Sequence, residues 1–267
     1  MNTPVTWLES RGHKIACCII GAQLSDKSVT ATAATNQPTV MFCGGFKSNM
    51  QGTKALALQQ LCQTNHWPCV RFDYSGHGQS GGDFTAGNID NWLHDALTVI
   101  DAIDNPHGVV LVGSSMGAWI ATLIALKRTS VVKGLVTIAA APDFTNRLLN
   151  DKLDKTQLDT LFSGQPVNLP SEYDDGSPYP ITLQLIENSK QHCLLDRTHP
   201  LDIPIRMLHG TKDSDVPYTT SIALMDALIC TDVQLTLIKD GNHRLSSPAN
   251  IDLLESTLTD MLISLQG

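Results

Sequence analysis

A short apolar segment runs into a Gly-x-Ser-x-Gly turn and then into a second apolar segment. Residues 109–112, Val-Val-Leu-Val, have the length and β-branched composition of a strand that is buried on both faces. Residues 118–126 form an Ala-rich apolar run, which predicts a buried helix. Between the two lies Gly113-Ser114-Ser115-Met116-Gly117. The sequence therefore predicts a strand, a tight turn and a helix, with the hydroxyl of Ser115 exposed at the apex.

The two glycines and the helix give this turn its chemical interest. Gly113 and Gly117 lack Cβ atoms, so the strand and the helix can approach each other closely beside Ser115. The positive end of the helix points at the same place and favours a developing oxyanion. The same pentapeptide also occurs in ordinary loops, so a nucleophilic role for Ser115 requires a base and an acid elsewhere in the chain.

Strands and helices alternate over most of the remaining sequence. Residues 7–23 predict two strands joined by a turn at Arg11-Gly12. Further strands are predicted at 39–43, 69–73, 131–140, 205–209 and 233–238, and helices at 53–62, 88–103, 218–228 and 251–265. Such alternation predicts an α/β fold: a mostly parallel sheet flanked by helices on both faces.

The alternation stops between Phe144 and Asp202. This insertion (residues 144–202) is longer than an ordinary connection and carries an acidic patch at Glu172, Asp174 and Asp175. Short helices are expected near 152–162 and 182–190, and the apolar runs of the insertion need a surface to cover. We interpret residues 1–267 as one domain in which the insertion caps the site, although a plain surface excursion is the alternative reading.

Two residues downstream complete a constellation with Ser115. Asp213 and His243 each follow a predicted strand by a few residues, so all three side chains should meet at the carboxyl edge of the sheet. A serine hydroxyl needs an imidazole to accept its proton, and a carboxylate must orient that imidazole. The chain order Ser, Asp, His is that of the α/β-hydrolases. The backbone N–H groups of Phe46, after Gly44-Gly45, and of Met116 are the expected oxyanion donors.

Other residues compete for these roles. Asp215 is the rival acid, but it adjoins Val216-Pro217, where the chain should already turn into its next helix. His209, at a strand end before the acid, is the rival base and is interpreted as a buried, hydrogen-bonded histidine. His77 precedes Ser115 and lies among glycines, which indicates a turn histidine. His192 and His199 fall in the insertion.

Four stretches carry a resemblance to a known family. They are Phe72–Gly78, Gly113–Gly117, His192–Leu195 and Leu208–Asp213. They resemble the branch of the α/β-hydrolases typified by the mitochondrial α/β-hydrolase domain-containing protein ten, from about Thr39 to the C-terminus. The resemblance implies an acyl-protein (palmitoyl) thioesterase, or an esterase for acyl glucuronides of mycophenolic acid. It also implies the α/β-hydrolase fold, with a mostly parallel sheet of the eight-stranded type, and Ser115, Asp213 and His243 as the triad.

Composition limits the partners and suggests a location. The net charge of −8 without a basic run argues against nucleic acid and anionic membrane surfaces as partners, and no apolar stretch is long enough to span a bilayer. The 7 cysteines lack metal-ligand spacing, and the N-terminus shows neither a secretory signal nor a presequence. We therefore expect a cytoplasmic protein that needs no metal or cofactor.

The leading hypothesis is a serine hydrolase that cleaves carboxylic thioesters or esters, with an acylated small molecule or protein as substrate. A small-molecule carboxylesterase is the first alternative. A peptidase, a carbon–carbon bond hydrolase and a non-catalytic binding protein on the same scaffold are the others.

Overall fold

A central eight-stranded sheet organises the computed structural model, which describes residues 4–24, 36–170 and 178–266. The strand order is β1-β2-β5-β4-β7-β8-β12-β14. Only the pairs β1–β2 and β2–β5 within this sheet are antiparallel. The strands are β1 (Val5–Ser10), β2 (His13–Ile20), β4 (Thr39–Cys43), β5 (Cys69–Phe72), β7 (Val109–Ser114), β8 (Val132–Ile138), β12 (Ile205–Gly210) and β14 (Val233–Ile238).

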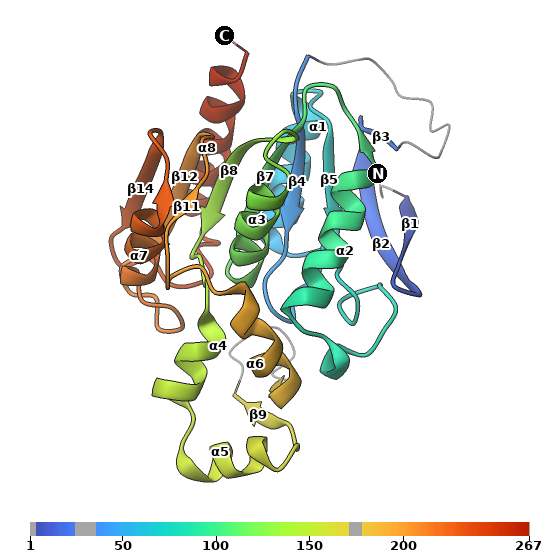
Figure 1. Ribbon diagram of the computed structural model, residues 1–267. Helices are drawn as coiled ribbons and strands as arrows, with labels where there is room; N and C mark the ends of the chain where they lie inside the picture. The colour runs from blue at the N-terminus through green and yellow to red at the C-terminus, as the bar shows by residue number, and fades with distance from the viewer. Residues whose placement is uncertain (1–3, 25–35, 171–177, 267) are drawn as a thin grey trace.

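Helices cover both faces of this sheet (Figure 1). One face packs against α1 (Thr53–Thr64) and α8 (Pro248–Ser264), the other against α2 (Ile89–Ala102), α3 (Met116–Lys127) and α7 (Thr219–Ala227). Alternate side chains of a strand point to opposite faces. Val40 and Phe42 accordingly join the core under α1 and α8, and Met41 and Cys43 join the core under α2 and α3. The expected mostly parallel α/β-hydrolase sheet is confirmed.

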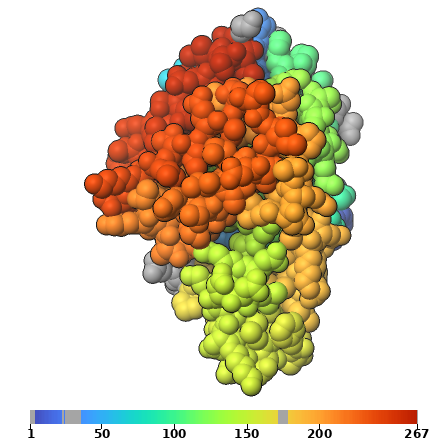
Figure 2. Space-filling view, turned by 60° about the vertical axis from the view of Figure 1, so that its left-hand side comes forward, coloured from blue at the N-terminus to red at the C-terminus, as the bar shows by residue number. Residues whose placement is uncertain are grey.

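The insertion leaves the sheet at its carboxyl edge (Figure 1). Its described elements are α4 (Phe144–Arg147), the π-helical turn η2 (Leu148–Lys152), α5 (Lys155–Phe162), β9 (Val167–Leu169), β10 (Tyr179–Ile181), α6 (Leu183–Ser189) and the 3-10 turn η3 (Lys190–His192). In Figure 2 the yellow-green residues of α4 and α5 protrude beneath the orange residues of the C-terminal third. The insertion therefore stands over the edge where Ser115, Asp213 and His243 were expected.

Several details differ from the expectations. The chain forms an antiparallel pair, β9 with β10, inside the insertion. Short pairs also join β3 (Gln23–Leu24) to β6 (Ile103–Asp104) and β11 (His199–Pro200) to β13 (Leu228–Ile229), and a 3-10 turn, η1 (Phe84–Ala86), precedes α2. Helix α8 begins at Pro248 rather than at Ile251, because Ser247 caps it by accepting the N–H of Asn250. The acidic patch at 172–175 lies outside the described residues. No helix in the described parts of the chain is both long and apolar enough to traverse a bilayer.

Candidate active site

Ser115 occupies a strained position between β7 and α3. Its backbone angles are φ 55° and ψ −121°, in a region that L-residues rarely adopt. Such a conformation costs about 1–3 kcal/mol and persists only where the surroundings impose it. This backbone conformation directs the side chain of Ser115 out of the turn. The side chain lies at the N-terminal, positive end of the buried helix α3.

Close backbone contacts impose this turn. A Cβ on Gly113 would lie 2.4 Å from the carbonyl oxygen of Gly117, and one on Gly117 would lie 2.1 Å from that of Cys43. Neither position has room for a side chain, because β4, β7 and α3 meet there backbone to backbone. The Gly-x-Ser-x-Gly pattern is thus a packing requirement of this site.

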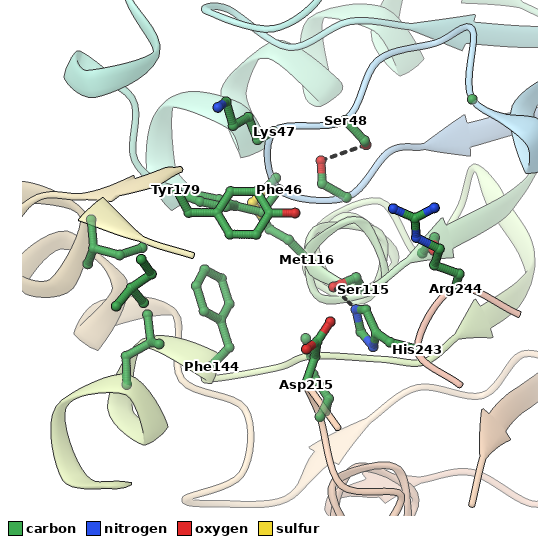
Figure 3. A pocket seen from close by; sticks show the side chains of 18 of the residues that line it. Phe46, Lys47, Ser48, Ser115, Met116, Phe144, Tyr179, Asp215, His243 and Arg244 are labelled. Carbon is green, nitrogen blue, oxygen red and sulfur yellow. Dashed lines mark hydrogen bonds between the residues drawn. The ribbon is translucent and has the colours of Figure 1, made fainter. Parts of the chain in front are cut away.

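A chain of hydrogen bonds runs from Ser115 through His243 to Asp213. The hydroxyl oxygen of Ser115 lies 2.9 Å from Nε2 of His243 (Figure 3), and Nδ1 of His243 lies 2.7 Å from Oδ2 of Asp213. The Asp213 side chain is fully buried and that of His243 is 13 % exposed. The three residues follow the carboxyl ends of β7, β12 and β14. These strands belong to the parallel part of the sheet, so their carboxyl ends lie at the same edge.

Asp213 is held from several sides. Its Oδ1 accepts the backbone N–H groups of Asp215 (2.9 Å) and Val216 (2.8 Å). Burial by itself raises the pKa of Asp213, but the hydrogen bonds from His209 and His243 outweigh it and hold the pKa well below its usual range. The group is therefore a carboxylate that can fix Nδ1–H of His243.

His209 supports Asp213 and stands apart from Ser115. Its Nε2 lies 3.0 Å from Oδ2 of Asp213 and 3.0 Å from the carbonyl oxygen of Val216. Both partners only accept, so Nε2 carries the proton and Nδ1 accepts from the hydroxyl of Ser221 at 2.7 Å. The ring is fully buried, as the sequence predicted for a structural histidine.

The loops that carry Asp213 and His243 touch at two glycines. A Cβ on Gly210 would lie 2.2 Å from the carbonyl oxygen of Gly241. The backbone N–H of Lys212 also donates to that oxygen at 2.9 Å. The contact sets the distance between the loop of Asp213 and the loop of His243.

Gly210→Ala should therefore separate the two loops. We expect the free energy of unfolding to fall by about 1–3 kcal/mol, the usual cost of overpacking. We also expect kcat to fall by about tenfold or more, since small misplacements in a catalytic site are costly. Urea unfolding and ester hydrolysis measure the two effects. Gly81→Ala is the matched control, because a Cβ there meets nothing closer than 3.6 Å. Wild-type activity in Gly210→Ala would contradict this account of the loops.

Two backbone segments next to Ser115 present N–H groups. Met116 is the first residue of α3, so its N–H has no acceptor within the helix. The Gly44-Gly45 segment lies against the turn, since a Cβ on Gly45 would be 3.5 Å from Cβ of Ser115. Phe46 follows directly, at the expected place beyond β4.

Ser115 opens into a cavity of about 570 Å³. Figure 3 shows Ser115 and His243 on one side and the rings of Phe144 and Tyr179 on the other. The volume lies within the range of about 300–1,000 Å³ that is common for small-molecule sites. The wall combines apolar and basic side chains, namely Phe46, Met116, Phe144, Leu148, Leu169 and Ile181 with Lys47, Lys54, Arg147, Lys152 and Arg244.

Lys54 connects this cavity wall to the His243 loop. Its Nζ donates to the carbonyl oxygen of Arg244 and contacts Oγ of Ser246 at 3.4 Å. Burial, followed by the nearby charge of Arg244, lowers the pKa of Lys54 from 10.5 to about 8. The sequence reading missed this residue. A lysine in the first turn of a helix is electrostatically disfavoured. The position of Lys54 at the start of the helix expected at 53–62 was therefore the sequence feature that could have drawn attention to it.

The three other histidines considered from the sequence lie outside the hydrogen-bonded chain of Ser115, His243 and Asp213. His77 is buried beneath the loop after β4. His192 is buried in the insertion, where its carbonyl oxygen accepts the indole N–H of Trp119 at 2.9 Å. His199 lies in β11, already beside β13. In the described residues no group of three or more His, Cys, Asp or Glu is placed to hold a metal ion.

Comparison with known proteins identifies the family to which this chain belongs. A family model described as serine aminopeptidase, S33, of the α/β-hydrolases matches residues 34–247. The chain belongs to the α/β-hydrolase family. It is accordingly a hydrolase.

Relatives within the α/β-hydrolase family span nearly the whole chain. The palmitoyl-protein thioesterase ABHD10, mitochondrial, of Bos taurus is 34 % identical over 257 residues, which cover 96 % of this chain and 83 % of the relative. The solved mouse α/β-hydrolase domain-containing protein 10 superposes with a TM-score of 0.85 at 31 % identity, covering 98 % of this chain and 99 % of that one. A crystal structure from Agrobacterium vitis S4 gives 0.86 at 35 % identity, with 97 % and 99 % covered. The resemblance to this branch is thus confirmed.

The expected cytoplasmic location is wrong by the same comparison. It rested on the absence of a recognisable leader, whereas the Bos taurus relative is named as mitochondrial. The residues that form the sheet and the cavity serve folding and chemistry, so they do not indicate a subcellular location.

Proposed function

We propose that the chain is a serine hydrolase of thioesters and carboxylic esters. Ser115 is the nucleophile, His243 is the general base, and Asp213 is the carboxylate that orients His243. The observation that carries the proposal is the Ser115–His243–Asp213 chain, 2.9 Å and 2.7 Å per link, beside a cavity. The backbone N–H groups of Phe46 and Met116 are the oxyanion donors. Residues 1–267 act as one domain, with the insertion as the cap.

The proposed reaction proceeds in two halves. Oγ of Ser115 bonds to the acyl carbon while Nε2 of His243 takes the hydroxyl proton, and the negative charge moves to the carbonyl oxygen. The bond to the leaving alcohol or thiol then breaks, and His243 protonates the leaving group. A water molecule attacks acyl-Ser115 with His243 again as base, which releases the acid and restores Ser115. Asp213 holds the tautomer of His243 throughout.

The apolar lining of the cavity favours a substrate with a long acyl chain. Phe46, Phe144 and Tyr179 form an aromatic wall, with ring centroids 5.7 Å apart for Phe46–Phe144 and 5.6 Å for Phe46–Tyr179. Apolar walls gain free energy by removing methylene groups from water, at about 0.8 kcal/mol for each buried group. A palmitoyl-protein thioesterase activity, as the name of the Bos taurus relative states for that protein, is the specific form we propose.

The basic side chains of the cavity favour a second candidate. Lys54, Arg147 and Lys152 line it in a chain whose net charge is −8. Cationic walls attract anionic substrates. A carboxylesterase for small molecules with an anionic leaving group, of the acyl-glucuronide kind, is therefore the alternative.

A matched series of substrates separates the two candidates. We expect kcat/KM to rise from acetyl to palmitoyl thioesters, because each added methylene is buried against the aromatic wall. The measurement compares p-nitrophenyl esters and acyl thioesters of equal chain length, with and without a carboxylate on the leaving group. An optimum at short chains combined with a preference for the anionic leaving group would replace the thioesterase assignment by the carboxylesterase one.

A further inference from the structure

The segment after β5 contains the Asp73-Tyr74-Ser75-Gly76-His77-Gly78 motif, which the proposed reaction does not use. His77 is 3 % exposed, and its ring lies beneath the loop that carries Phe46. Its Nε2 is 3.1 Å from the backbone nitrogen of Lys47, and its Nδ1 is 3.2 Å from the carbonyl oxygen of Ser75. A carbonyl can only accept, so Nδ1 carries the proton and Nε2 accepts the N–H of Lys47.

Lys47 has a strained backbone conformation within this loop. Its φ is 57°, a left-handed value that a lysine adopts only under constraint. The hydrogen bond to His77 fixes the peptide plane between Phe46 and Lys47. The next peptide plane towards the N-terminus contains the N–H of Phe46, the proposed oxyanion donor.

The same motif also holds the far end of the loop. Oδ1 of Asp73 accepts the backbone N–H of Met50 at 2.6 Å, and Oδ2 accepts that of Gln79 at 2.8 Å. Gly78 leaves room for that carboxylate, since a Cβ there would lie 2.1 Å from Oδ2. The loop is therefore clamped at Lys47 and at Met50 by one short segment.

The ring of His77 is itself held rigidly. The rings of Tyr74, Phe84 and Trp92 stand edge-on around it, with centroids at 5.5, 4.9 and 5.2 Å. The indole N–H of Trp92 donates to the carbonyl oxygen of Ser75 that also accepts from His77. Burial lowers the pKa of His77 to about 4, so the ring is neutral and able to accept at neutral pH.

We propose that His77 is a positioning residue, which holds the N–H of Phe46 in the oxyanion site by accepting the N–H of Lys47. This inference rests on the proposed function. An oxyanion donor acts on charge that develops only in the transition state. Loss of the His77 contact should therefore lower kcat and leave KM almost unchanged.

Three variants of His77 test the role. His77→Leu removes the acceptor, His77→Asn places an acceptor too far from Lys47, and His77→Gln carries one to nearly the position of Nε2. We expect kcat to fall about 10- to 100-fold in the Leu and Asn variants, as for small misplacements in a catalytic site. Affinity for a trifluoromethyl ketone analogue of the tetrahedral intermediate should fall by a similar factor. His77→Gln should restore most of both, and His107→Leu, at an exposed histidine, should behave as wild type.

The outcomes separate this inference from the proposed function. Labelling of wild-type Ser115 by a fluorophosphonate tests the function alone. If the wild type is labelled and the Asn and Gln variants share one kcat, the positioning role is overturned. A rise in KM at constant kcat would overturn it as well. Because Asn and Gln are both polar and similar in size, their comparison stays decisive if His77→Leu does not fold.

Discussion

Ser115→Ala is expected to lower kcat by at least about 10⁴-fold on any ester or thioester that the wild type cleaves, as removal of the nucleophile does in other serine hydrolases. No other hydroxyl in the described parts of the chain is hydrogen-bonded to Nε2 of His243. What should remain is the stabilisation offered by the proposed oxyanion donors and the binding of substrate. Steady-state hydrolysis and fluorophosphonate labelling measure the loss, and both signals should disappear together.

The stability of the protein provides the control for this variant. Alanine keeps the Cβ at φ 55°, so Ser115→Ala should unfold at the same urea concentration as the wild type. Ser115→Gly relieves the strain and should be more stable by about 1 kcal/mol, yet equally inactive. Ser256→Ala, at an exposed serine of α8, should keep full activity. Undiminished hydrolysis by Ser115→Ala would remove the basis of the proposed mechanism.

Much of the fold follows from local patterns in the sequence. The run Val109–Val112 has the length and composition of a buried strand, and the glycines around Ser115 allow the strand and the helix to approach closely. Parallel strands then bring all following loops to one edge, so the meeting of Ser115, Asp213 and His243 could be predicted without coordinates. Their roles in catalysis remain a proposal that the variants test.

Other features depend on contacts that no local pattern encodes. Lys47 and His77 are 30 residues apart, and Lys54 and Arg244 are 190 apart. Each contact is a side chain meeting the backbone of a loop, so hydrophobic periodicity does not reveal it. The β9–β10 pair has three residues in each strand and forms where the insertion folds back on itself. Such short strands are stabilised by their surroundings more than by their own propensity.

The choice between Asp213 and Asp215 leads to the second large effect. Asp213→Asn should lower kcat by about 10⁴-fold, because an amide stabilises the wrong tautomer of His243 and cannot balance the charge that forms on the ring. Asp215→Asn should change kcat by less than about tenfold, since Asp215 serves Asp213 through its backbone N–H, which the substitution leaves in place. Its side chain lines the cavity (Figure 3), so the larger effect should appear in KM.

The pH dependence of stability gives an independent measurement for the same pair. The pKa of Asp213 is lower in the folded chain than in the unfolded one, so below the unfolded value the unfolded state binds more protons. The stabilisation by this carboxylate is thus complete above about pH 4 and is lost as the pH falls towards the folded pKa. Asp213→Asn should flatten the acid limb of the unfolding curve, whereas Asp215→Asn should leave it unchanged. If instead Asp215→Asn abolished turnover and Asp213→Asn retained it, the orienting carboxylate would have to be reassigned to Asp215, and the hydrogen bond between Asp213 and His209 would be structural.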